Sequence, residues 1–409
     1  MFSRIISTLL ATFVLFLSSC VVDYAGEQGI EEAMKLHHEL LTVDSHTDTP
    51  LRFFRTGTNL ARKSDSRKGG GKLDFPRMKE GGLDAVFFAV FLGQSERTSE
   101  GNETARNRAL TLFDSIHAVV GRNSEIAEIA LSSSDLKTIA KKGKSAVYIG
   151  IENAYPIGRD LSLVERFYNM GARYITLCHT ANNDVCDSST DKDGEEHGGL
   201  SEFGAEVIME MNRLGIMIDV SHVSDKSFFD VIEKSQAPVI ASHSNSREVC
   251  ENPRNLTDEM LLKLADNDGV IQLCVLSDYV TETEPFPERD SAKMTVREKY
   301  GDWNGLGDST RNLFAAEWYA IDNIFPPRLA NVSQFCDHVD HIVDLIGIDH
   351  VGFGSDFDGG AGLEGCYDVT ELPNVTLELL RRGYSKSDLQ KFWSGNLMRV
   401  MRDVETAAY

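Results

Sequence analysis

The sequence is poor in basic residues and lacks the common phosphate-binding motifs. It holds 41 lysines and arginines against 63 aspartates and glutamates, a net charge of −22 over 409 residues. This balance argues against nucleic acid as a partner, because binding to a phosphate backbone depends on basic patches. No G-x-G-x-x-G motif and no P-loop occurs. The triplet Gly69-Gly70-Gly71 is flanked by lysines but lacks the strand–loop–helix context of a phosphate cradle.

The first twenty residues differ from the rest of the chain. Arg4 precedes an apolar run over 5–17, which is too short to span a membrane comfortably and is typical of an export signal. The run ends in Leu17-Ser18-Ser19-Cys20, which resembles the lipobox of bacterial lipoproteins. That resemblance implies cleavage before Cys20 and lipidation of this cysteine. Because the residue directly after Cys20 is Val21 and not an aspartate, the resemblance also favours the outer membrane over retention in the inner membrane. An ordinary signal peptide with an incidental Cys20 is the alternative.

Cysteine is scarce and its spacing argues against a zinc ribbon. The chain has seven cysteines, and no two of them form a C-x-x-C pair. Six remain after Cys20, an even number that permits disulfides in an exported protein. Cys178 and Cys274 lie inside apolar runs, so we predict that they are free core residues.

Eight short apolar segments alternate with helical segments or long loops. The predicted strands are 40–43, 84–92, 145–151, 174–177, 216–220, 238–241, 270–276 and 350–354. The predicted helices are 31–41, 105–120, 163–170, 200–214, 226–234, 257–265, 334–346 and 387–404. Short apolar strands alternating with helices indicate a parallel sheet buried on both faces. Eight such units predict an α/β fold, a closed (β/α)8 TIM-like barrel.

A long polar segment separates the last two predicted strands. It covers 279–327 and contains Trp303 and Trp318. Long segments of this kind in a compact domain are usually functional or inserted. We predict an insertion that either covers the site or meets a partner.

Histidines and carboxylates follow several strands at the point where each ends. They are His46 and Asp48 after the first strand, Glu152 after the third, His179 after the fourth, His222 after the fifth, His243 after the sixth and Asp356 after the eighth. Barrel enzymes build their sites at this end of the strands. Four of the chain's eleven histidines fall there. A hydrogen-bonded core histidine explains any one of them but does not explain the set.

The donor types predict a metal centre. Imidazoles and carboxylates without a thiolate suit zinc or a similar divalent ion. Five donors are too many for one open four-coordinate ion and suit two ions that share one carboxylate. Glu152, between the two groups of ligands, is the predicted bridge. The predicted ligands of the first ion are His46 and Asp48, and those of the second are His222 and His243. Asp356 is predicted to take a proton from the bridging water and pass it to a leaving amine.

The motifs around these residues resemble the membrane (renal) dipeptidase family of the amidohydrolase superfamily. They are Asp44-Ser45-His46-Thr47-Asp48, Gly150-Ile151-Glu152, Thr176-Leu177-Cys178-His179, Asp219-Val220-Ser221-His222-Val223, Ser242-His243-Ser244 and Gly354-Ser355-Asp356-Phe357-Asp358-Gly359. Their order and context agree over 40–399. The resemblance implies a distorted (β/α)8 barrel with two zinc ions that hydrolyses dipeptides, including those with a C-terminal D-residue. It also implies a homodimer. On this basis the chain divides into a lipoprotein signal (1–20), a tether (21–30) and one catalytic barrel domain (31–409).

The resemblance also implies residues that contact the substrate. His179 would contact the substrate and the transition state, and Asp356 would be the acid and base. Arg254 would grip the substrate carboxylate, because a guanidinium fork suits that planar anion. A surface ion pair is the ordinary alternative for Arg254. Tyr279 would lie near the same carboxylate.

Two other functions remain open on the sequence. The first is another amidohydrolase-superfamily hydrolase acting on a lactam, an ester or an N-acyl amino acid. Such enzymes often bridge their metals with a carboxylated lysine, whereas the third strand here offers Glu152. The second is a catalytically inactive solute-binding lipoprotein, against which the complete set of predicted ligands argues. The expected partners are a dipeptide and, through the N-terminal lipid only, a membrane.

Overall fold

The computed structural model describes residue 24 and residues 26–54, 58–301 and 306–409. The predicted export signal, the lipidation site Cys20 and most of the predicted tether lie outside the described residues. Within the described part of the chain, no helix combines the length and apolar character that crossing a bilayer requires.

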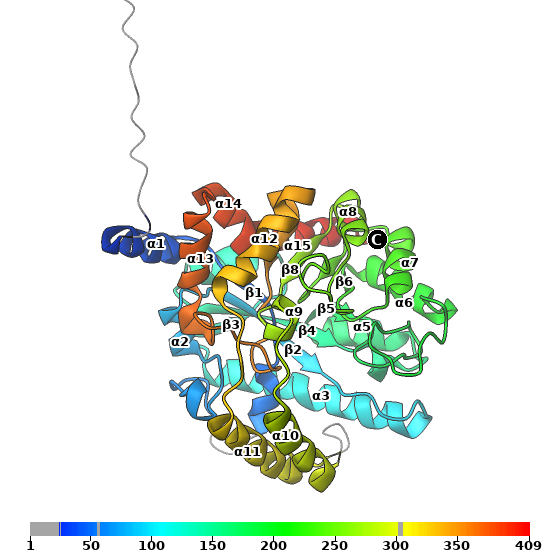
Figure 1. Ribbon diagram of the computed structural model, residues 1–409. Helices are drawn as coiled ribbons and strands as arrows, with labels where there is room; N and C mark the ends of the chain where they lie inside the picture. Colours follow the sequence, from blue (N-terminus) through cyan, green and yellow to red (C-terminus); the bar gives the residue numbers. More distant parts are fainter. Residues whose placement is uncertain (1–23, 25, 55–57, 302–305) are drawn as a thin grey trace, which may run out of the picture.

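Eight parallel strands form the predicted barrel (Figure 1). In order they are β1 (Val43–Thr47), β2 (Ala85–Phe91), β4 (Ser145–Glu152), β5 (Ala172–Thr176), β6 (Met217–Asp219), β7 (Ile240–Ala241), β8 (Val270–Leu273) and β9 (Val351–Phe353). Beyond the ends of β1 and β9, Asp48 donates its backbone N–H to the Phe357 carbonyl at 2.8 Å. The Asp356 N–H likewise reaches the His46 carbonyl at 3.0 Å. These bonds nearly close the barrel beside the residues predicted to form the site.

Helices cover the outside of the barrel and one of its ends. They are α1 (Glu27–Glu39), α2 (Phe75–Glu80), α3 (Ser99–Arg122), α4 (Asp135–Ala140), α5 (Ser162–Asn169), α6 (Glu202–Leu214), α7 (Asp225–Lys234), α8 (Asp258–Asp266), α9 (Ser277–Val280), α10 (Pro287–Tyr300), α11 (Asp308–Ile324), α12 (Val332–Ile346), α13 (Pro373–Arg381), α14 (Lys386–Gln390) and α15 (Asn396–Ala407). Ser224 caps α7 and Thr257 caps α8 by accepting backbone N–H groups of the first turn.

The structure differs from the predicted elements in several places. The first helix begins at Glu27 rather than residue 31, so the end of the predicted tether is helical. The last predicted helix is divided into α14 and α15 by a π-helical turn over Lys391–Gly395. The short strand β3 (Ala127–Ile129), which pairs with β4 outside the barrel order, was not predicted. All six described cysteines are free and buried, which confirms the prediction for Cys178 and Cys274.

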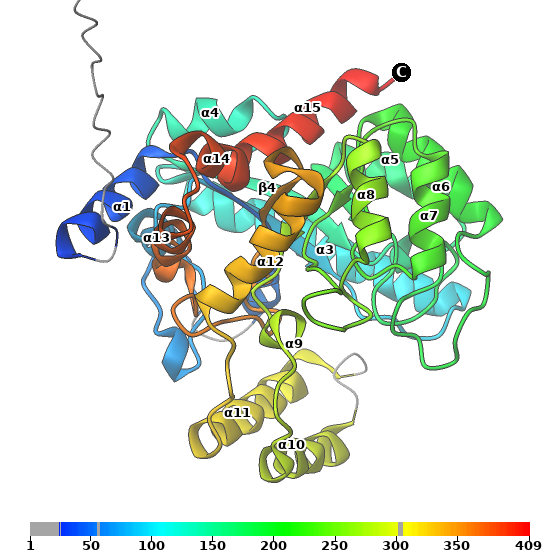
Figure 2. The same ribbon diagram turned by 45° about the horizontal axis from the view of Figure 1, so that its top comes forward.

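The inserted segment lies between β8 and β9, as predicted, but it is mostly helical. α10 and α11 pack side by side and project from the barrel beyond α9 (Figure 2). Val296, Phe314 and Ile321 form a small core between them, against which Trp318 packs. The two helices therefore form a hairpin with a core of its own.

The interior of the barrel holds an aromatic stack that leads to the site. The ring of Tyr148 lies 4.7 Å from that of Phe87, and the ring of Tyr174 lies 5.4 Å from Phe87. On the opposite side, α15 contributes Leu397 and Val400 to the same apolar cluster. The helix thus closes one end of the barrel, and the polar residues gather at the other.

Candidate metal centre and active site

The side chains predicted from the strand ends converge at one mouth of the barrel. The buried members are His46, Asp48, Glu152, His222, His243 and Asp356. All of them except His46 line one cavity of about 1870 Å³, together with His179 and Tyr279. The barrel therefore brings together residues that are more than 300 positions apart in the chain.

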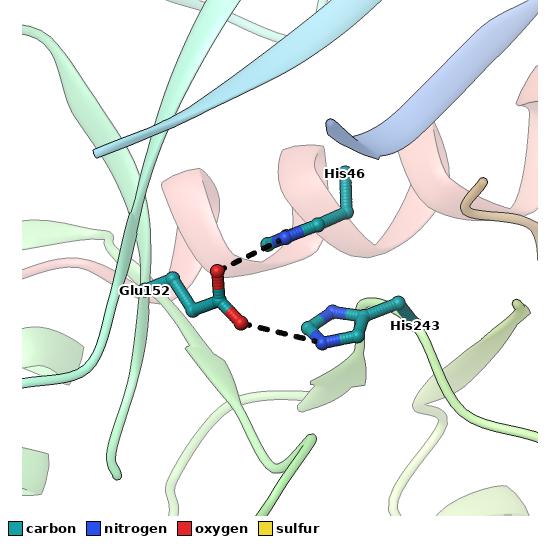
Figure 3. A group of neighbouring side chains, drawn as sticks. All are labelled: His46, Glu152 and His243. Carbon is teal, nitrogen blue, oxygen red and sulfur yellow. Dashed lines mark ion pairs between the residues drawn. The ribbon is translucent and has the colours of Figure 1, made fainter. Parts of the chain in front are cut away.

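Glu152 lies between two sets of ligand atoms. Its Oε2 is 3.3 Å from His46 Nε2, and its Oε1 is 3.1 Å from His222 Nε2 and 3.6 Å from His243 Nε2. Figure 3 shows the carboxylate between His46 and His243. Each carboxylate oxygen thus faces a different histidine set, which is the arrangement a bridging ligand requires.

Several of these atoms are buried without any hydrogen-bond partner among the described residues. They include His46 Nε2, Asp48 Oδ1 and Glu152 Oε2. His46 Nε2 also lies 4.0 Å from Asp48 Oδ1, so the three atoms face one another. Burying polar atoms without partners is costly, and a coordinated cation would satisfy all three. This donor set fits a divalent metal ion.

The histidines of the site are crowded and are held in their neutral form. The Nε2 atoms of His222 and His243 lie 2.8 Å apart. Burial, together with the charge of Arg254 and of neighbouring histidines, holds the pKa of both imidazoles well below its usual value. Burial and Arg254 also lower the pKa of His179 to about 3. A neutral imidazole is the form that binds a metal.

The distances alone do not assign each histidine to one of the two predicted ions. The ligand atoms of His46, Glu152 and His243 lie within 4.8 Å of one another, as do those of Glu152, His179 and His222. The ring centroids of His243 and His46 are 4.0 Å apart, and those of His243 and His222 are 4.9 Å apart. His243 therefore adjoins both predicted metal positions.

The ionised form of the site's carboxyl groups is unfavourable, because these groups are buried and lie close together. Burial raises the pKa of Asp48 well above its usual value, and the charge of Glu152 adds to this effect. Burial also raises the pKa of Glu152 to about 8 and that of Asp356 to about 7, although the positive charge of Arg254 opposes both shifts. A bound cation reverses this balance, because its charge favours ionised carboxylates.

Residues behind the ligands fix their orientation, and sequence reasoning missed them. His46 Nδ1 lies 2.8 Å from the Tyr174 hydroxyl. His243 Nδ1 lies 2.7 Å from Ser242 Oγ, which donates to Asp219 Oδ2 at 2.6 Å. These contacts turn the Nε2 atoms toward the site, as outer-sphere partners of metal ligands commonly do. The available signal was the aspartate two or three residues before His46 and His222 in their motifs.

Two glycines leave space that the site needs. A Cβ at Gly150 would lie 2.0 Å from the Tyr174 ring, so this glycine permits the tyrosine to reach His46. A Cβ at Gly359 would lie 2.1 Å from Asp356 Oδ1. Asp356 itself has a φ of 60°, a left-handed conformation that is costly for a residue with a side chain. Local strain therefore accompanies the predicted acid and base.

Arg254 is buried and has no carboxylate partner among the described residues. Its Nη2 donates to the His243 carbonyl at 3.2 Å, and its Nε has no hydrogen-bond partner. The guanidinium carbon lies 5.3 Å from the ring centroid of Tyr279, which lines the cavity. Burial rules out the ordinary surface ion pair. An unpaired buried cation instead suits an anionic group supplied by a ligand.

A (β/α)8 barrel with histidines and carboxylates at the ends of its strands defines the class of metal-dependent hydrolases. Residues 30–409 match the model of "Membrane dipeptidase (Peptidase family M19)". The chain belongs to this family, as its motifs predicted, and is a metallopeptidase of the dipeptidase type.

Named relatives agree with this assignment. Human Dipeptidase 3 is 32% identical over 378 residues, which cover 91% of this chain and 67% of the relative. The probable dipeptidase PvdM from Pseudomonas aeruginosa superposes with a TM-score of 0.80 at 30% identity, covering 93% of this chain and 99% of the other. A metallo peptidase from Rhodobacter sphaeroides, liganded with a phosphinate mimic of the dipeptide L-Ala-D-Ala, superposes with a TM-score of 0.72. It is 26% identical, with 89% of this chain and 99% of the other covered.

Proposed function

We propose that this chain is a dizinc dipeptidase that cleaves the single peptide bond of free dipeptides. The observation that carries the proposal is the position of Glu152, whose two oxygens face two different sets of ligands. The ligands of one ion would be His46 and Asp48 and those of the other His222 and His243, with Glu152 shared. A carboxylated lysine is not needed for this bridge, which favours a dipeptidase over other amidohydrolases.

The chain's own residues have distinct roles in the proposed reaction. Two zinc ions, when bound, supply Lewis acidity and lower the pKa of a water. A carboxylate oxygen of Asp356 accepts the proton of the attacking water and then donates it to the leaving amine nitrogen. Neutral His179 would donate a hydrogen bond to the carbonyl oxygen under attack, a role supported by its Nε2 lying 3.5 Å from Glu152 Oε1.

The restriction to free dipeptides would come from charge recognition. Arg254 binds the substrate carboxylate, and the buried carboxylates of the metal centre favour a free amine nearby. Acceptance of a C-terminal D-residue belongs to the same proposal. It is supported by the L-Ala-D-Ala mimic bound to the Rhodobacter sphaeroides relative.

Metal titration tests the proposed centre. Protein stripped of metal by a chelator should bind two equivalents of zinc per chain. Glu152→Gln should bind at most one equivalent tightly, because the amide cannot bridge two cations as a carboxylate does. Asp278→Asn removes a cavity-lining carboxylate that accepts a hydrogen bond from Thr283 Oγ1, and this variant should keep both zinc equivalents. One equivalent in the unaltered protein, or two undiminished equivalents in Glu152→Gln, would contradict the bridged centre.

We also propose that the protein is exported and anchored by a lipid on Cys20 to the outer membrane of a bacterial cell. The lipobox-like motif at 17–20 supports this proposal. In a bacterial host, the protein should incorporate labelled fatty acid and sediment with membranes, and Cys20→Ala should abolish both. Fatty-acid labelling that survives Cys20→Ala would refute it.

The homodimer implied by the family resemblance stays a prediction. The mass of the Cys20→Ala protein measured by sedimentation would check it.

A further inference from the structure

The outer wall of the active-site cavity is basic although the chain as a whole is acidic. The net charge is −22, yet lysines and arginines from two separate segments line the cavity beyond the metal centre. One group comes from the loop after β1, and the other comes from the α10–α11 hairpin. In each group, two cations lie over a single aromatic ring.

The first group is built on Tyr367. The Arg67 guanidinium carbon lies 4.1 Å from the ring centroid, and Lys72 Nζ lies 3.7 Å from it. The Lys72 ammonium donates to the Ala361 carbonyl, and no carboxylate oxygen lies within 4.0 Å of it among the described residues. Arg67 is 3.6 Å from a Glu371 oxygen at the surface. The positive charge of this group is therefore only partly neutralised.

The second group is built on Trp318 of α11. Lys293 Nζ lies 4.4 Å from the indole centroid, and the Arg297 guanidinium carbon lies 5.2 Å from it. Lys293 has a carboxylate partner, Asp322, at 3.0 Å. Arg297 has no carboxylate partner in the part of the chain that the structure describes. The hairpin thus presents an unpaired guanidinium toward the cavity.

The cavity is larger than a small dipeptide needs. Its volume is about 1870 Å³, whereas pockets for small ligands usually measure about 300–1,000 Å³. A dipeptide with short side chains, held at the metal centre and Arg254, would leave the outer part unfilled. Cations on aromatic faces bind carboxylates well, because the rings contribute apolar contact while the cations supply charge and hydrogen bonds.

We propose that these two groups, which we call the cation–aromatic subsites, bind a carboxylate on a substrate side chain and make the enzyme prefer acidic dipeptides. This inference rests on the proposed dipeptidase function and assigns its substrate class. Arg254 takes the α-carboxylate, and the cation–aromatic subsites take the additional one. Their partly exposed charges also attract anionic substrates from solution, an effect that salt weakens.

The test compares acidic dipeptides with amides of the same shape. kcat/KM is measured for Glu-Ala against Gln-Ala and for Ala-Glu against Ala-Gln. In at least one pair, we expect the acid to be favoured by about tenfold at low ionic strength, as for a partly desolvated charge pair. The preference should fall as sodium chloride is raised to about one molar, where screening is strong.

Variants of the hairpin then assign the preference to its residues. Arg297→Gln, and more strongly Arg297→Gln with Lys293→Gln, should lower the acid-to-amide ratio, whereas Arg297→Lys should largely restore it. Lys299→Gln removes an equal charge from the same helix outside the cavity and should leave the ratio unchanged. The ratio cancels any general loss of activity that a variant causes.

The outcomes separate this inference from the proposed function. Equal rates for acids and amides in both pairs would overturn both cation–aromatic subsites while leaving the dipeptidase intact. A preference that Arg297→Gln with Lys293→Gln leaves unchanged would overturn the assignment to the subsite on Trp318. If none of the four dipeptides is cleaved, the proposed function itself is overturned.

Discussion

Asp356→Asn should retain both metal ions and lose about 10²–10⁴-fold in kcat, the usual contribution of a positioned general acid and base. The amide keeps the shape of the carboxylate but cannot accept the proton of the attacking water. Asparagine should fit without a change in the backbone, because it has the same shape as aspartate and Gly359 leaves the same space beside it. Metal content and kcat for one neutral dipeptide are the measurements.

A neighbouring carboxylate supplies the matched control. Asp358 accepts hydrogen bonds from Thr49 Oγ1 and the Lys72 N–H and lies 3.6 Å from Arg52, so its role is structural. Asp358→Asn should cost much less in kcat than Asp356→Asn. If Asp356→Asn keeps its metals and stays within tenfold of the unaltered enzyme, Asp356 does not transfer the proton.

Arg254→Ala should raise KM for free dipeptides by about 30-fold or more, because losing one member of a buried charge pair costs roughly 2–5 kcal/mol. The guanidinium is buried and has no carboxylate partner among the described residues, so a substrate carboxylate is the group it would meet. Arg254→Lys should recover only part of the loss, since an ammonium lacks the planar fork. The measurement is KM for a dipeptide and for its C-terminal amide.

The KM for the dipeptide amide shows which substrate group Arg254 contacts. A carboxylate contact predicts that Arg254→Ala affects the amide far less than the free dipeptide. An equal effect on both substrates would show that Arg254 supports the site in another way. Arg247 is a suitable control, because its guanidinium already pairs with Asp225 at 2.7 Å. Arg247→Ala should not change the ratio of the two KM values.

The barrel could be predicted because its strands are apolar on both faces. Segments such as Ala85–Phe91 and Ser145–Glu152 are almost entirely buried, and this burial produces continuous hydrophobic runs in the sequence. The hairpin gave no such signal. In α10 only Val296 is buried, so the segment has the composition of a polar loop although it is helical. The three-residue strand β3 is too short to have a recognisable pattern.

The ligands of the site could be predicted because each lies at the carboxyl end of a strand or within three residues beyond it. Parallel strands bring their carboxyl ends together, so position along the chain alone places His46 near His243. The orienting residues could not be found in this way. Tyr174 reaches His46 across 128 positions, and Ser355 binds Asp44 across 311, through contacts that exist only once the barrel has closed. The motifs point to Asp44 and Asp219, but sequence spacing does not show which distant side chains these aspartates contact.

Hydrolysis of a dipeptide panel before and after chelation, and again after zinc is returned, tests the account most directly. The panel contains L-L, L-D and glycyl-dehydro dipeptides, with a tripeptide and an N-acetyl dipeptide as negatives. The account predicts cleavage that is confined to free dipeptides, is lost on chelation and is restored by zinc. Cleavage that persists without metal, or no cleavage of any dipeptide by protein carrying two zinc ions, would contradict it.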